Sequence, residues 1–167
     1  MRTCYFAAMN LPLPLDHHAI RVLDREAAAT RLTLMGYWIV ADFDLVLEDG
    51  STAKSYAMAH SLNPEIFVSS GPEGSKIHRW VEKHGGKGAV HHIAYAVDSV
   101  AETMAEWLNE GVVFDRKEPL VCPCETPLVQ IFTEEDPATG MIYELIERNG
   151  HPGFCQANVA RLMGGSS

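Results

Sequence analysis

Residues 16–22 read Asp-His-His-Ala-Ile-Arg-Val and residues 91–97 read His-His-Ile-Ala-Tyr-Ala-Val, so a similar motif occurs twice in the chain. A shift of 75 positions places the first motif on the second, brings His17 onto His92 and brings Gly36 onto Gly111. Self-similarity at a fixed period fixes an architecture before any single motif does. The sequence therefore predicts two copies of one supersecondary unit.

Each copy predicts the order strand, helix and three further strands. The motif itself alternates like a strand, and residues 25–35 and 100–110 behind it have helical character. Asp24 and Ser99 suit the N-caps of these helices, and the repeated glycines suit their C-terminal caps. The further strands that we expect are 37–47, 53–60 and 65–69 in the first copy and 112–115, 127–133 and 141–148 in the second, with turns at 48–50 and 136–140.

This order divides the chain into five parts. They are an N-terminal segment (1–14), a first βαβββ module (15–70), a linker helix (71–88), a second βαβββ module (89–149) and a C-terminal segment (150–167). The linker helix is expected over 74–83, before the break Gly-Gly-Lys-Gly at 85–88, and the last helix over 156–163.

Composition narrows the classes of partner. With 167 residues and 47% hydrophobic residues, the chain can bury the core of one compact domain. Its formal net charge of -9, from 22 acidic and 13 basic residues, disfavours a nucleic-acid partner. No apolar run approaches the roughly 20 residues that span a bilayer, and the first 15 residues do not resemble a secretion signal. We therefore expect a soluble, cytoplasmic protein without a membrane partner.

Each motif contains two adjacent histidines, and strand geometry turns them to opposite faces. In the second motif His92 shares its face with two alanines, whereas His91 lies among bulky residues that would pack beneath the helix of the module. In the first motif His17 lies with Ala19, and His18 lies on the other face. The alanine face leaves room for a metal ion and a substrate, so His17 and His92 are the predicted ligands.

A carboxylate on the last predicted strand completes this set. Glu144 shares its strand face with Ile142 and Ile146. Burying a carboxylate among aliphatic residues costs several kcal/mol unless a partner compensates its charge, and a divalent cation would do so. Two imidazoles and one carboxylate form a facial arrangement that leaves three positions open and favours Fe(II).

The four cysteines, Cys4, Cys122, Cys124 and Cys155, give weak evidence for a structural metal, because a zinc knuckle needs two well-spaced pairs. We expect them to be free thiols in a reducing compartment.

Several stretches resemble the vicinal oxygen chelate superfamily, and within it the C-terminal catalytic half of the 4-hydroxyphenylpyruvate dioxygenase family. These stretches are 85–94, 128–133, 142–148 and 153–158. The resemblance implies an α+β fold in which two tandem βαβββ modules form a cupped mixed sheet around one metal site, with a short C-terminal helix. It implies iron bound by His17, His92 and Glu144, and a C-terminal segment that acts as a lid. The implied substrate contacts are Ser55, Gln130, Phe154 and Asn158.

The function that we expect from this resemblance is an Fe(II)-dependent dioxygenase that oxidises a small-molecule 2-oxo acid with O2. The alternative is an isomerase, because residues 80–92 also resemble methylmalonyl-CoA epimerase. Such an enzyme, or one similar to glyoxalase I, would use Co, Mn, Ni or Zn and usually a fourth protein ligand. The repeat places Ser69 at the position equivalent to Glu144, and the nearest carboxylate is Glu65. A third reading is a protein that only sequesters a small molecule. The sequence leaves open a homodimer and the identity of the 2-oxo acid.

Overall fold

The computed structural model describes residues 12–47 and 49–165; Glu48, residues 1–11 of the predicted N-terminal segment and residues 166–167 lie outside these ranges. The strands are β1 (Leu15–Arg21), β2 (Trp38–Val46), β3 (Thr52–Ala59), β4 (Glu65–Ser70), β5 (Ala89–Ala96), β6 (Leu120–Val121), β7 (Val129–Phe132) and β8 (Ile142–Glu147). The helices are α1 (Arg25–Thr33), α2 (Lys76–Lys83), α3 (Val100–Asn109) and α4 (Gln156–Gly165).

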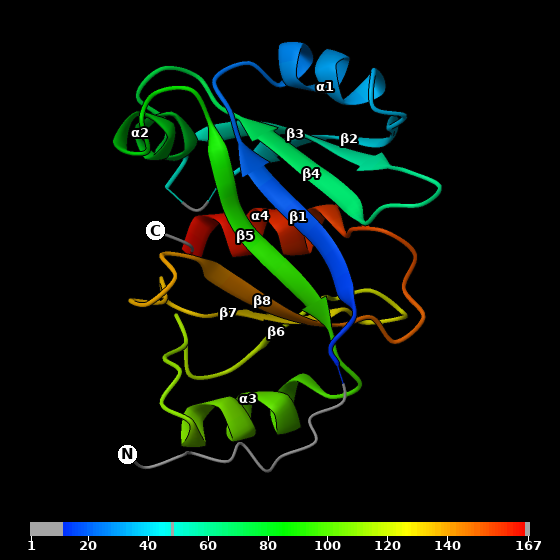
Figure 1. The fold of residues 1–167 in the computed structure, drawn as a ribbon, viewed down its shortest axis with the longest axis vertical. Helices are drawn as coiled ribbons and strands as arrows, with labels where there is room; N and C mark the ends of the chain where they lie inside the picture. Colours follow the sequence, from blue (N-terminus) through cyan, green and yellow to red (C-terminus); the bar gives the residue numbers. More distant parts are fainter. Residues whose placement is uncertain (1–11, 48, 166–167) are drawn as a thin grey trace, which may run out of the picture.

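All eight strands of the described ranges form one curled sheet, in the order β2-β3-β4-β1-β5-β8-β7-β6 (Figure 1). The two halves are related by the repeat, because β1 and β5 pair antiparallel at the centre and pair in parallel with β4 and β8, respectively. The predicted α+β fold, with two tandem βαβββ modules and a short C-terminal helix, is confirmed.

The helices cover both faces of the sheet. In Figure 1, α1 and α3 lie at opposite ends of the molecule, where α1 contacts β3 and β4 and α3 contacts β7 and β8. By contrast, α4 lies between the two halves and contacts β2 and β6, the first and last strands of the sheet. No helix in the described ranges is long and apolar enough to cross a membrane.

Strand alternation assigns core residues to the two faces. On β4, Phe67 packs in the inner core with α4, whereas Val68 packs outward with residues of α1. On β8, Leu145 packs outward with α3, and Ile146 points inward. Glu144 is two residues from Ile146 and so points inward as well.

Gly88 lies where the start of β5 passes the end of β1. A Cβ atom there would approach the backbone oxygen of Arg21 to 2.8 Å and the side chain of Val22 to 3.0 Å, and the residue has a φ of +95°. Glycine is therefore required at this position both for space and for backbone conformation. The Gly-rich break thus allows the second module to pair closely with the first.

The strand predicted over 112–115 is wrong. Only Phe114 forms an isolated bridge, with Thr133, and the edge strand of this half is the two-residue β6. The intervening residues 115–118 are all charged, and Pro119 lacks a backbone N–H, so the segment is a poor substrate for continuous pairing.

The face predicted for His91 is also wrong. The register of β1 against β5 shifts between Ala19–His92 and Ile20–Val90, so His91 is an extra residue on β5. An extra residue in one strand interrupts the alternation of side chains. His91 is therefore buried beside His92, against Trp80 of α2, at 5.3 Å between ring centroids, rather than beneath α3.

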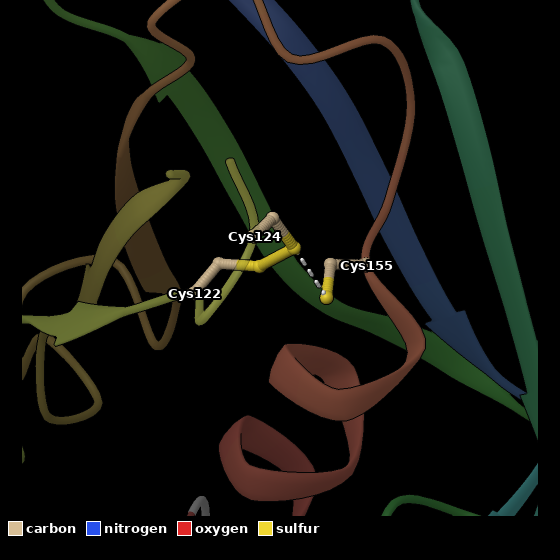
Figure 2. Close-up of side chains that lie close together, drawn as sticks. All are labelled: Cys122, Cys124 and Cys155. Carbon is tan, nitrogen blue, oxygen red and sulfur yellow. Dashed lines mark hydrogen bonds between the residues drawn. A yellow bond between two sulfur atoms is a disulfide. The ribbon is translucent and has the colours of Figure 1, made fainter. Parts of the chain in front are cut away.

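The expectation of free thiols is wrong for two cysteines. A disulfide joins Cys122 to Cys124 in the segment between β6 and β7, and the free thiol of Cys155 lies beside it (Figure 2). Cys4 lies outside the described residues. The sequence could not indicate this grouping because Cys155 is 31 residues from Cys124 along the chain.

Candidate metal centre

Three neighbouring strands bring His17, His92 and Glu144 together on the inner face of the sheet. The Oε2 atom of Glu144 lies 3.3 Å from His17 Nε2 and 3.0 Å from His92 Nε2, and the two imidazole nitrogens are 3.4 Å apart. All three residues are buried. The structure thus brings together the three ligands predicted from the repeat and from strand alternation.

The spacing of these donor atoms fits a divalent metal ion. For ligands about 2.1 Å from the ion, neighbouring donors are roughly 3.0 Å apart at a right angle and roughly 3.4 Å apart at a tetrahedral angle. The three observed separations of 3.0, 3.3 and 3.4 Å lie in this range. Two imidazoles and a carboxylate on one side of an ion would leave its other side open.

A second layer of polar groups orients His17. Asp16 Oδ1 lies 2.7 Å from His17 Nδ1, which leaves Nε2 directed to the metal site. The guanidinium of Arg148 holds this carboxylate with bonds of 2.7 and 2.6 Å. Burial alone would raise the pKa of Asp16, but its bonds to His17 and Arg148 lower it, so the carboxylate stays ionised.

His91 orients His92 as Asp16 orients His17, through a hydrogen bond to its Nδ1 atom. The two Nδ1 atoms are 2.8 Å apart, so one ring must donate and the other accept. When His92 Nε2 binds a metal, its remaining proton is on Nδ1 and is donated to His91. The proton of neutral His91 is then on its Nε2 atom, which is buried and has no hydrogen-bond partner among the described residues.

The charges of the metal-free site are set by burial and by Glu144. Burial would lower the pKa of His17, but Glu144 and Asp16 outweigh it and raise this pKa to about 9. For His92 burial prevails, and its pKa lies below the usual value. Burial would raise the pKa of Glu144, but the two histidines lower it. At neutral pH the site therefore contains a protonated His17, a neutral His92 and an ionised Glu144.

Gln130 and Asn158, two of the predicted substrate contacts, form a chain of hydrogen bonds that ends at Glu144, a predicted metal ligand. Asn158 Nδ2 donates to Gln130 Oε1, and Gln130 Nε2 donates to Glu144 Oε1 at 2.5 Å. This leaves the Oε2 atom of Glu144 to face the two histidines. Both amides are buried, and Gln130 also lines the cavity beside the metal site.

Ser55 lies on β3, and β4 separates this strand from β1, which carries His17. Ser55 is therefore one strand too far from the metal site for a direct contact. Its hydroxyl is 2.9 Å from that of Ser69, and of these two residues only Ser69 lines the cavity. Ser69 is also the repeat equivalent of Glu144 and is buried. The first module thus has a hydroxyl and not a carboxylate at the repeat position of Glu144, in the wall of the same cavity.

The C-terminal segment forms part of the cavity wall. The ring of Phe154 lies 4.9 Å from the rings of both His17 and Phe67 and packs edge-on against the histidine. The cavity encloses about 40 Å³, whereas one water needs roughly 10–15 Å³ on this measure. This volume has room for a few water molecules but not for a larger ligand. The cavity-lining residues are His17, Ala19, Ile20, Arg21, Phe67, Ser69, His91, His92, Gln130, Phe132, Glu144, Phe154, Val159, Leu162 and Met163.

Sequence reasoning missed the residues that support the ligands. Asp16 could have been found, because a carboxylate next to a ligating histidine is a common orienting partner. Arg148 could not, because its contact with Asp16 joins segments that are distant in the sequence. The same holds for Arg21 of the cavity wall, whose guanidinium lies 5.3 Å from the indole ring of Trp80 in α2.

The comparisons with known proteins agree with this architecture. Residues 16–120 match the family model described as the Glyoxalase/Bleomycin resistance protein/Dioxygenase superfamily. Among curated proteins the comparison finds no match.

Three similar solved structures come from different bacteria. A mutant of 4-hydroxymandelate synthase from Streptomyces coelicolor has a TM-score of 0.80 and 20% identity, over 92% of this chain and 53% of the synthase. Methylmalonyl-CoA epimerase from Mycobacterium tuberculosis has a TM-score of 0.63 and 20% identity, over 80% and 86% of the two chains. A hypothetical protein from Bacillus halodurans gives 0.66 and 24%, over 84% and 98%. The chain thus spans about half the length of the synthase, and at these identities the likeness shows the fold alone.

Proposed function

The chain belongs to the glyoxalase/bleomycin resistance protein/dioxygenase superfamily, and on this premise we propose that it is an Fe(II)-dependent dioxygenase acting on a 2-oxo acid. The observation that supports this most is the composition of the site: two histidines and one glutamate, with a serine at the repeat position of the glutamate. Three protein ligands leave room for a two-point chelate and for O2. The likeness to 4-hydroxymandelate synthase over 92% of the chain is in keeping with this proposal.

In this proposal some residues would bind the metal and others would orient its ligands. His17, His92 and Glu144 would hold Fe(II), which when bound supplies the redox chemistry for the activation of O2 and the oxidative decarboxylation of the 2-oxo acid. Asp16 and Gln130 would fix the orientations of His17 and Glu144, both of which line the cavity.

The cavity wall determines where a substrate would lie. His91 Nε2–H can donate to an oxygen of the chelating end of the substrate, since the Nδ1 atom of this ring accepts from His92. Phe67, Phe132 and Phe154 form an apolar wall that suits an aromatic or branched tail and excludes water.

The second candidate is a metal-dependent epimerase, which the likeness to methylmalonyl-CoA epimerase favours. Glu65 lies on the strand face of Phe67 and Ser69, and its Oε2 atom is buried without a hydrogen-bond partner among the described residues. An isomerase would polarise a carbonyl with a redox-inert ion and would need such a carboxylate as a base. However, Glu65 is four positions from Ser69 along β4, outside the cluster of potential ligands.

Oxygen-uptake measurements distinguish the dioxygenase from the epimerase. Protein loaded anaerobically with Fe(II) is mixed with a panel of aromatic and branched 2-oxo acids, and O2 consumption and CO2 release are recorded. A thioester epimerisation assay with Co(II) protein runs in parallel, with Glu65→Gln as a variant. We expect oxygen uptake that depends on one member of the panel and that Glu65→Gln leaves intact. Epimerisation that Glu65→Gln abolishes, with no oxygen uptake on any acid, would replace the dioxygenase with the isomerase.

A further inference from the structure

A cluster of three sulfur atoms lies outside the metal centre. The Cys155 thiol approaches the sulfur of Cys124 to 3.0 Å, and the three sulfurs all lie within 4.8 Å of one another. Figure 2 shows Cys122 and Cys124 on the segment before β7 and Cys155 on the loop that leads into α4. Because Cys124 has no proton in the disulfide, this contact is the approach of a thiol to a disulfide.

The position of Cys155 connects this cluster to the closure of the metal site. It follows Phe154, whose ring lies on His17, and its backbone oxygen accepts from Val159 in the first turn of α4. The other two cysteines belong to the segment between β6 and β7, where Cys122 is buried against Leu128 and Ile146 of the sheet. A bond between Cys155 and this segment would therefore join the lid to the sheet.

We propose that Cys122, Cys124 and Cys155 form a thiol–disulfide relay that locks the C-terminal segment over the metal site. The Cys155 thiolate attacks Cys124 Sγ, the Cys122–Cys124 bond breaks, and a Cys124–Cys155 bond forms. The electron pair leaves on Cys122, which takes up the proton that Cys155 lost. The exchange consumes no oxidant or reductant.

The burial of the three residues suits this direction of attack. Cys124 and Cys155 are half-buried, whereas Cys122 is only 2% exposed. The residue whose sulfur leaves is thus buried in the apolar core, and the two residues whose sulfurs join are less buried. In the locked form the new bond would close a loop that contains β7, β8 and the lid, so Phe154 could not leave His17 freely.

The test uses metal-free protein in a Cys4→Ser background, so its result does not depend on the proposed oxygenase activity. Protein equilibrated with oxidised and reduced glutathione is quenched in acid, alkylated and digested with trypsin, which separates peptide 118–148 from peptide 149–161. We expect both an internal disulfide in the first peptide and a cross-link between the two peptides. Absence of the cross-link at every redox ratio would overturn the relay.

Two single variants test the effect on the lid. Cys122→Ser can form only the locking bond, and Cys155→Ser can form only the bond within the β6–β7 segment. After oxidation, hydrogen exchange of the α4 amides should be about tenfold slower in Cys122→Ser than in Cys155→Ser, with α3 as an unchanged reference. Dithiothreitol should remove the difference. Equal exchange rates in the oxidised variants would contradict the proposal.

One further outcome would replace the relay with another role for the three cysteines. If reduced protein with Glu144→Ala binds one zinc ion per chain, and Cys155→Ser abolishes this binding, the cluster is a thiolate metal site rather than a relay.

Discussion

At the scale of single residues, a variant of Gln130 can show whether this residue orients Glu144 or only contacts the substrate. Its amide donates to Glu144 Oε1, so Gln130→Ala should weaken metal binding by about 10- to 100-fold, because partners of metal ligands have effects of that size. Gln156→Ala is the matched control, since Gln156 is exposed and its side-chain amide donates to the backbone oxygen of Asp44 in β2. Competition with a fluorescent chelator measures both. An unchanged affinity in Gln130→Ala would leave Gln130 as a substrate contact alone.

The raised pKa of His17 predicts a proton release on metal binding. Between its usual value of 6.5 and about 9, metal-free protein carries a proton on His17 that an incoming ion must displace. Metal affinity should therefore rise with pH across this window, and calorimetry in buffers of different ionisation enthalpy should count about one proton released near pH 7.5. The stability of the metal-free fold should change with pH in the opposite direction. The ion pairs of His17 stabilise this fold below pH 6.5, and their contribution is lost as the pH rises to 9. Binding without proton release would contradict this account.

The ligand set could be read from the sequence because its members obey local rules. The repeat and the alternation of regular strands place His17, His92 and Glu144 on one face, and the structure has them there. His91 could not be placed, because the bulge depends on how β5 pairs with β1. The resemblance pointed to Gln130, but whether its amide meets a substrate or Glu144 depends on strand register.

At the scale of elements, Arg148 joins three parts of the chain directly after β8. It holds Asp16 of β1, donates to the backbone oxygen of Gly153 at 2.5 Å and packs on Phe154 of the C-terminal segment. Arg148→Met keeps the aliphatic stem but removes these bonds, so it should lower the free energy of unfolding by about 1–3 kcal/mol and speed hydrogen exchange over 149–155.

The control for this variant is Arg116→Met. Arg116 has a similar side-chain exposure, but its ion pair is with its neighbour Asp115. Its loss should cost less than about 1 kcal/mol. Urea unfolding compares the two variants, and equal losses would mean that Arg148 does not act as a junction.

Most elements were predictable because α1 and α3 begin at residues that suit an N-cap and the long strands alternate in character. Asp24 and Ser99 accept from backbone amides of their helices as expected. The failure at 112–115 has a different origin, since that segment has an apolar pattern but meets its partner strand only at Phe114. Edge segments depend on what the neighbouring strand offers, which local sequence does not record.

At the scale of the whole molecule, a metal ion bound by His17, His92 and Glu144 would join the two modules. An ion at a hundredfold excess over its Kd stabilises the fold by about 2.7 kcal/mol. For a chain of this size, Tm should rise by roughly 5–10 °C. Glu144→Ala should abolish the increase, whereas the exposed Asp44→Asn should keep it. Calorimetry with and without chelator decides, and an increase that survives Glu144→Ala would place the ion elsewhere.

The contact of α4 with both β2 and β6 has a consequence for solubility. An open sheet has two outer strands whose unpaired N–H and C=O groups can recruit a strand from another molecule. Here one helix lies against both outer strands, and β2 also exposes Trp38, Ile39 and Val40. Deletion of α4 would therefore expose the edge strands β2 and β6. The shortened protein should self-associate, which light scattering would detect, while its circular dichroism spectrum still shows β-structure.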